Sequence, residues 1–227
     1  MIILTGASGG IGRTILPMLS QLDDVIALYH STPPEIVGND RIECHKLNLS
    51  SESDIKAFCA KMKKKFKKVT LIHAAALSND GLAAQLDVND WDQVMDVNLR
   101  GNFLITRELL TPMIREKWGR IIHCSSVAGV RGMPGTLAYS TSKTGLQGMS
   151  RVLAREYARF NITSNILVLG YFNTGLIETL SENIRESIKE EIPSKKLGDP
   201  YEIVCAVEFL IKSGYTNGSL VNIDGAI

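Results

Sequence analysis

The chain has 227 residues, of which 44% are hydrophobic and 22% are charged, proportions typical of a globular protein with a substantial core. Twenty-five basic residues against twenty-four acidic ones leave a net charge of +1, which argues against nucleic acid or a membrane surface as a partner. No apolar run reaches the roughly 18 residues of a membrane span, and no signal-peptide pattern opens the chain, so we expect a cytoplasmic protein.

Short apolar strands alternate with helical patterns along the chain. The expected strands cover about residues 1–5, 25–29, 42–47, 69–73, 120–124, 162–169 and 219–223. The expected helices cover about residues 11–22, 53–66, 91–115, 137–158, 179–191 and 200–212. This alternation predicts an α/β, Rossmann-type doubly wound parallel sheet of about seven strands with helices on both faces. Since no linker or repeat interrupts it, we expect a single domain over residues 1–227.

A glycine-rich turn, Gly6-x-x-x-Gly10-x-Gly12, separates the first strand from the first helix. Glycine permits a tight turn and a close approach of the backbone to a phosphate, while the helix N-terminus offers unpaired N–H groups and a partial positive charge. The position between strand and helix favours a dinucleotide-binding turn over a merely structural one.

The end of the second strand bears on the choice of nicotinamide cofactor. An acidic residue there would bind the ribose 2′-hydroxyl of NAD and repel a 2′-phosphate. This chain has His30, Ser31 and Thr32 instead. Small polar or weakly basic side chains can accommodate a phosphate, so NADP(H) is favoured and NAD(H) stays as the alternative.

The segment Tyr139-Ser-Thr-Ser-Lys143 carries the strongest chemical signal. Residues four apart on a helix emerge on the same face. A phenol holds its proton tightly at neutral pH, and a nearby ammonium stabilises the phenolate. Ser126, thirteen residues upstream, is placed to hold a substrate oxygen against the phenol. The scattered cysteines and histidines have no metal-ligand spacing, so no metal is expected.

Taken together, these motifs resemble the short-chain dehydrogenase/reductase family. The resemblance rests on residues 5–12, 91–101, 119–126 and 139–143. Residues 196–203 and 221–225 are most similar to the 3-oxoacyl-[acyl-carrier-protein] reductase branch.

The resemblance implies a role for each of four residues. Ser126 would orient the substrate oxygen, and Tyr139 would be the general acid/base. Lys143 would hold the nicotinamide ribose and support the tyrosine, while Asn98 would anchor a water in a proton relay. Residues 175–196 are expected to form a substrate lid.

The resemblance also implies which residues contact the cofactor. They are Thr5, Gly6, Ser8, Gly10, Ile11, Gly12, His30, Ser31, Thr32, Asn48, Ala74, Ala75, Tyr139, Lys143, Gly170 and Thr174.

Three positions depart from the family pattern. His73-Ala74-Ala75-Ala76 replaces the usual N-N-A-G after the fourth strand, Asn48 replaces a frequent aspartate, and Leu169 replaces a proline. These departures alter local hydrogen bonding and turn rigidity, and they leave the reacting groups in place.

The sequence therefore predicts an NADP(H)-dependent oxidoreductase that reduces a ketone to a secondary alcohol, with a 3-oxoacyl thioester as the implied substrate. A dehydrogenase of a sugar, steroid or other small alcohol is an alternative, and a non-catalytic nucleotide-sensing regulator is another.

The resemblance also implies partners. The central helices, residues 91–115 and 137–158, are expected to join copies into a homodimer or homotetramer. Lys117, Arg120 and Arg159 are candidates for docking an acyl carrier protein. The lysine run at residues 61–68 is interpreted as a solvated helix end, with docking of an acidic carrier or nucleic acid as the alternative.

Overall fold

The computed structural model describes residues 1–227 apart from the side chain of Leu176. Within it, seven parallel strands form one sheet in the order β3–β2–β1–β4–β5–β6–β7. The strands are β1 (Ile2–Thr5), β2 (Val25–Tyr29), β3 (Ile42–Lys46), β4 (Val69–His73), β5 (Gly119–Ser126), β6 (Ile162–Leu169) and β7 (Leu220–Ile223). The order reverses beside β1, as in a doubly wound fold. The fold class predicted from the sequence is confirmed.

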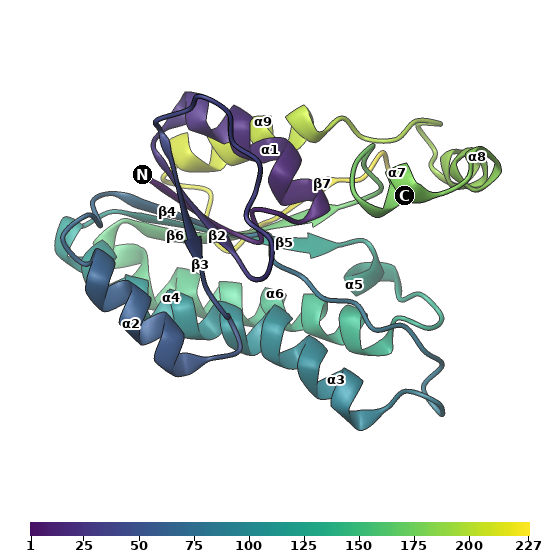
Figure 1. The fold of residues 1–227 in the computed structure, drawn as a ribbon, viewed down its shortest axis with the longest axis horizontal. Helices are drawn as coiled ribbons and strands as arrows, with labels where there is room; N and C mark the ends of the chain where they lie inside the picture. The colour runs from purple at the N-terminus through teal and green to yellow at the C-terminus, as the bar shows by residue number, and fades with distance from the viewer.

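Helices cover both faces of the sheet (Figure 1). On one face lie α1 (Gly10–Leu22) and α9 (Pro200–Lys212), and on the other lie α2 (Glu52–Met62), α4 (Gly101–Glu116) and α6 (Leu137–Tyr157). Alternate strand residues point to opposite faces. Ile3, Leu71 and Ile121 therefore pack in one core, and Leu4, Ile72 and Ile122 pack in the other.

The long central helix contains a wide turn that the sequence did not predict. The expected helix over 91–115 is α3 (Val88–Met95), the π-helical turn η1 (Asp96–Arg100) and then α4. Gly101 follows the turn, where a Cβ would come 2.8 Å from the carbonyl oxygen of Leu49. Single π-turns inside helices are frequent at functional sites, and this one contains Asn98.

Helix α2 ends at Met62, four residues before the predicted end. In a longer helix, the lysines of the 61–68 run that stand three or four residues apart would share one face and repel one another, which disfavours further helical turns. The chain instead buries Phe66, whose ring centroid lies 6.5 Å from that of Phe58. The lysines of the 61–68 run are exposed. They precede β4, so they lie at the amino-terminal edge of the sheet.

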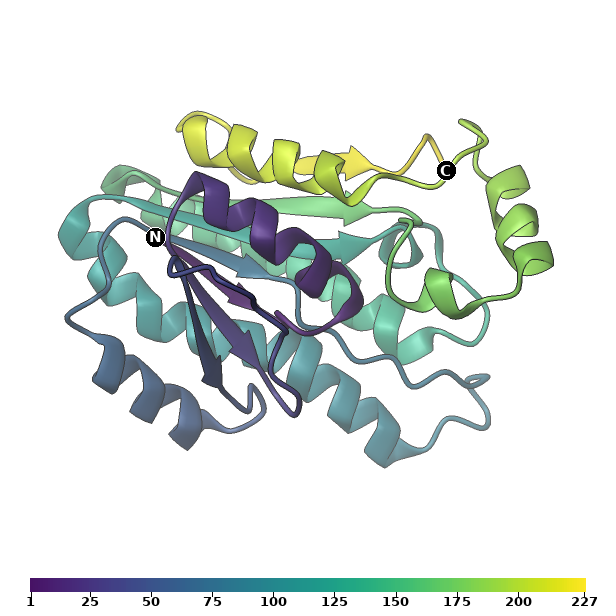
Figure 2. The ribbon, with the colours of Figure 1, turned by 45° about the horizontal axis from the view of Figure 1, so that its top comes forward.

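Shorter helices complete the chain. They are α5 (Ala128–Arg131), η2 (Ala158–Phe160), α7 (Leu176–Thr179) and α8 (Glu182–Glu191). Both α7 and α8 lie at the end of the molecule toward which β5 and β6 point (Figure 2). None of the helices in the described part of the chain has the length and apolar character needed to span a membrane.

Candidate active site

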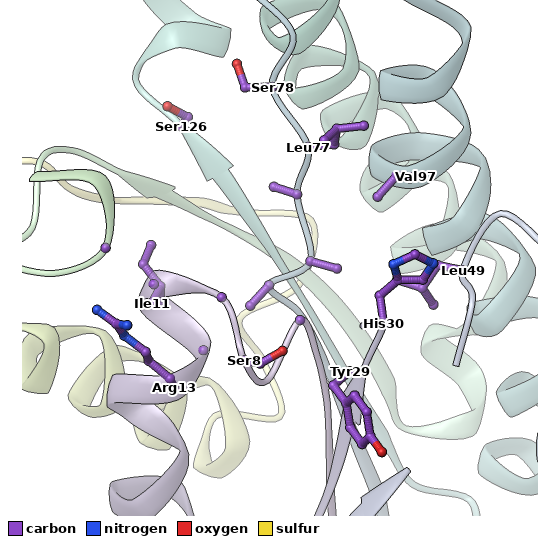
Figure 3. Close-up of a pocket in the computed structure, with 18 of the residues that line it drawn as sticks. Ser8, Ile11, Arg13, Tyr29, His30, Leu49, Leu77, Ser78, Val97 and Ser126 are labelled. Carbon is purple, nitrogen blue, oxygen red and sulfur yellow. The ribbon is translucent and has the colours of Figure 1, made fainter. Parts of the chain in front are cut away.

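A cavity of about 1550 Å³ follows the carboxyl ends of the strands. Ser126 and Ser78 lie toward one end of it, and Ser8, Tyr29 and His30 lie toward the other (Figure 3). Open parallel sheets bind ligands at this edge, beside the point where the strand order reverses. The cavity is therefore the candidate site, with a catalytic end at Ser126.

The glycine-rich turn forms the middle of the cavity wall. Gly6 has a φ of +69°, and a Cβ there would come 2.5 Å from the Cα of Ala75. The N-cap residue Gly9 makes no side-chain cap, and the first turn of α1 has no acidic residue. The first amides of α1 are therefore available to an anion. This cradle fits the pyrophosphate of a dinucleotide.

Replacing Gly12 with Ala is expected to lower cofactor affinity by at least about tenfold, or 1.4 kcal/mol. A Cβ at Gly12 would lie 2.0 Å from the Gly6 carbonyl oxygen, so the phosphate-binding turn would have to move. Titration of the purified variant with NADPH and with NADH measures the loss. Gly148→Ala is the matched control, because a Cβ at Gly148 meets no atom within 4 Å. Equal affinities in the two variants would contradict the role given to the turn.

Most of the predicted cofactor residues line this cavity. They are Gly6, Ser8, Gly10, Ile11, Gly12, His30, Ser31, Thr32, Asn48, Ala74, Ala75, Tyr139, Gly170 and Thr174. Thr5 is buried behind the wall, where its hydroxyl accepts the N–H of Ala75 at 3.2 Å. Thr5 therefore supports the segment after β4.

The catalytic end brings together Ser126, the last residue of β5, and Tyr139, the third residue of α6. Lys143 is buried behind them, and its Nζ lies 5.5 Å from the centre of the Tyr139 ring. The same ammonium donates to the carbonyl oxygen of Cys124 at 2.7 Å. The four-residue spacing thus places the buried Lys143 side chain beside the Tyr139 ring.

Asn98 is fully buried and connects the loop after β4 to α6. Its Oδ1 accepts the N–H of Leu77 at 2.8 Å, and its Nδ2 donates to the Leu77 carbonyl at 2.8 Å. The same Nδ2 donates to the hydroxyl of Ser142 at 3.0 Å. The backbone carbonyl of Asn98 accepts from Asn102 at 2.8 Å. Asn98 therefore holds the Leu77 loop against α6 beside the catalytic end.

His73, which stands where the family usually has an asparagine, packs against a second histidine. His73 pairs with His123 across β4 and β5, and their rings stack with centroids 4.8 Å apart. His73 Nε2 contacts the Thr106 hydroxyl at 2.9 Å, and His123 Nε2 contacts that of Ser164 at 3.2 Å. Burial, followed by the charge of nearby Lys143, lowers the pKa of His123 to about 3.

Burial likewise lowers the pKa of His73 well below its usual value, and His123 and Lys143 add to this effect. Both rings are therefore neutral in the folded protein.

Three charged residues that line the cavity were missed from the sequence: Arg13, Glu35 and Asp96. Arg13 lines it and forms a 2.6 Å ion pair with Glu178, which joins α1 to α7. Glu35 also lines it, beyond two prolines and five residues after His30. Glu35 lies beyond the end of β2, where the acidic residue of an NAD site is expected. The position of Arg13 directly after Gly12 was a usable signal.

Arg120, a candidate for carrier docking, is buried. Its guanidinium donates to the carbonyl oxygens of Ile211, Gly119 and Asn161 at 2.8–3.0 Å and lies 4.7 Å from the Trp118 ring centre. A guanidinium so engaged secures the start of β5 and is not presented to a partner.

Residues 1–185 match the family model for short chain dehydrogenases. The chain belongs to the short-chain dehydrogenase family. It is 35% identical to Nodulation protein G of Rhizobium sp. (strain N33), covering 99% of this chain and 95% of that protein. It is 32% identical to the 3-oxoacyl-[acyl-carrier-protein] reductase FabG of Aquifex aeolicus, covering 99% and 96%.

A solved short-chain dehydrogenase-like structure from Agrobacterium tumefaciens, described as a candidate gluconate dehydrogenase, superposes with a TM-score of 0.90. The two sequences are 27% identical, and the superposition covers 99% of this chain and 94% of the Agrobacterium chain. The family membership makes this chain an oxidoreductase that uses a nicotinamide cofactor, which confirms the prediction of an oxidoreductase.

Proposed function

We propose that this short-chain dehydrogenase reduces a ketone to a secondary alcohol, with a 3-oxoacyl thioester as substrate. The observation that carries the proposal is the grouping of Ser126 and Tyr139 at one end of the dinucleotide cavity, with Lys143 buried behind them. A reduced nicotinamide, when bound, supplies the hydride.

The chain's own residues would handle the substrate oxygen. Ser126 donates to the ketone oxygen and orients it, and Tyr139 donates the proton that the developing alkoxide requires. The buried ammonium of Lys143 favours the phenolate that remains after transfer. Asn98 holds the loop and helix that position these groups, and the family resemblance implies that it anchors a water in a proton relay.

The walls near the catalytic end favour an apolar substrate. Val127 and Met133 line this part of the cavity, and Ile177 of α7 lines it as well. The relatives named as 3-oxoacyl reductases support the same substrate class. We propose further that residues 175–196 act as the substrate lid, since α7 both lines the cavity and is joined to α1 through Arg13 and Glu178.

The second candidate function is oxidation of a sugar acid, which the likeness to the Agrobacterium structure favours. One assay separates the two. NADPH consumption with a 3-oxobutanoyl thioester is compared with NADP⁺ and NAD⁺ reduction by gluconate and a panel of small alcohols. Turnover of the thioester alone supports the proposal. Turnover of gluconate without the thioester would replace it with the second candidate.

For the cofactor we propose NADP(H), with His30, Ser31 and Thr32 around the 2′-phosphate. His30→Asp is expected to shift the kcat/KM ratio of NADPH to NADH toward NADH by roughly 10- to 100-fold, because a carboxylate repels the phosphate and accepts from a free ribose hydroxyl. Initial rates with both cofactors measure the ratio. Glu35→Gln is the companion variant, expected to move the ratio the other way. A wild-type preference for NADH would contradict the assignment.

We also propose that copies associate through α4 and α6. Phe103 on α4 and Val152 on α6 are about half exposed, and Phe103 borders a shallow apolar depression with Leu99 and Met149. An apolar surface of this kind suits a homodimer or homotetramer interface. For acyl carrier docking, exposed Lys117 and Arg159 stay as candidates.

A further inference from the structure

Hydroxyl groups gather at the catalytic end of the cavity. Among the described side chains there, they belong to Ser78, Ser126, Thr136, Tyr139 and Tyr171. Ser78 donates to the carboxylate of Asp80 at 2.5 Å, and Thr136 donates to the carbonyl of Met133 at 2.9 Å. These two donors are therefore already used.

The remaining hydroxyls have no strong acceptor within the described structure. Ser126 Oγ accepts the N–H of Ala128 at 3.2 Å and keeps its own proton free to donate. Ser126 and Tyr139 are the pair assigned above to the reacting ketone oxygen. Tyr171 is then a third donor, and the proposed reaction does not account for it.

Tyr171 is held in place by its backbone. It follows Gly170, whose N–H donates to the Ile223 carbonyl at 3.0 Å, and its own carbonyl accepts from Gly198 at 2.8 Å. The phenol reaches across to the loop before α6, where its oxygen lies 3.8 Å from the sulfur of Met133. A thioether is a weak acceptor, so a better acceptor in the cavity would displace it.

The Tyr171 phenol is also kept in its donating form. Burial raises its pKa, the Glu191 carboxylate adds to that effect, and Arg131 partly opposes it. A neutral phenol donates one hydrogen bond and carries no charge that would repel an acyl group.

A 3-oxoacyl thioester presents two oxygens. The ketone oxygen is two carbons away from the thioester carbonyl, and both need donors when the substrate leaves water. Ser126 and Tyr139 serve only the first. A simple ketone of the same length needs no further donor.

We propose that Tyr171 is a specificity-determining residue that donates a hydrogen bond to the second, thioester carbonyl of a 3-oxoacyl substrate. This inference rests on the proposed function and deepens it. Tyr171 thereby selects 1,3-dicarbonyl substrates over isolated ketones, and Met133 holds its phenol when no substrate is bound.

The test compares two substrates that differ at one carbon. One is a 3-oxobutanoyl thioester, CH3–CO–CH2–CO–SR, and the other is the matched thioether ketone, CH3–CO–CH2–CH2–SR. Tyr171→Phe is expected to lower kcat/KM for the thioester by roughly 3- to 10-fold, the value of one hydrogen bond, and to leave the thioether ketone within about twofold. The ratio of the two kcat/KM values is the readout.

Two controls locate the effect. Met133→Leu keeps the phenol and the volume of the side chain, so the ratio should stay at the wild-type value or rise. Tyr201→Phe removes an exposed phenol on α9 and should change neither substrate. An equal loss on both substrates in Tyr171→Phe, or no loss on either, would overturn the role of Tyr171. Absence of wild-type turnover of the thioester would overturn the proposed function and this inference together.

Discussion

Replacement of Tyr139 by Phe is expected to lower kcat by roughly 10²- to 10⁴-fold, the usual contribution of a positioned general acid. The ring and its contact with Lys143 would stay, so the variant loses the transferable proton and little else. Because the glycine-rich turn lies elsewhere in the cavity, NADPH should still bind. Steady-state rates and a fluorescence titration with NADPH measure the two quantities.

Tyr201→Phe serves as the matched control here as well, since Tyr201 lies exposed on α9 outside the cavity. It should retain wild-type kcat. Turnover near the wild-type level in Tyr139→Phe would refute the assignment of the proton donor. A joint loss of turnover and of cofactor binding would instead indicate a structural role for the hydroxyl.

Acidification from pH 6.5 to 4.5 is expected to destabilise the protein by about 2 kcal/mol through His123 alone, with His73 adding in the same direction. The folded-state pKa of His123 is lowered from 6.5 to about 3. In this interval His123 binds a proton in the unfolded chain and stays neutral in the folded chain. Its contribution to stability is therefore present above pH 6.5, the unfolded pKa, and is lost as the pH falls. Urea unfolding at several pH values measures the slope.

The chosen interval separates histidines from carboxylates. Glu52, whose pKa its hydrogen bonds with Lys56 and Arg107 lower from 4.5 to about 2, loses most of its contribution to stability below this range. His123→Asn, alone and combined with His73→Asn, should flatten the slope. His30→Gln, at an exposed histidine, should leave it unchanged. A steep slope that persists in the double variant would show that the stacked pair is not its source.

Much of the fold could be predicted because the buried strands are rich in apolar residues. Residues 25–29 and 69–73 are largely apolar and follow charged residues, and residues 162–169 begin and end with apolar residues; these segments form β2, β4 and β6 with the predicted bounds. Helix α9 also begins and ends as predicted, because Asp199 caps it and Pro200 starts it.

The rest depended on tertiary contacts. Local helix propensity does not predict the π-turn at Asp96–Arg100. The turn accompanies tertiary contacts, in which buried Asn98 bonds to Leu77 and Ser142. The cavity residue Glu35 is brought back by the irregular segment after β2, and periodicity says nothing about such a path. The chemistry at Ser126 and Tyr139 could be anticipated because strand ends and helix faces have fixed geometry.

The start of the segment 175–196 packs its main chain closely against the glycine-rich turn. A Cβ on Gly10 would come 2.4 Å from the Cα of Gly175, and Thr174 donates to the Gly10 carbonyl at 2.9 Å. The reach from the cofactor cradle to the substrate region is thus set by main-chain packing. Tyr171 and Met133 line the cavity outside this main-chain contact. Substitutions there can change which molecules fit while the hydride-transfer distance stays constant.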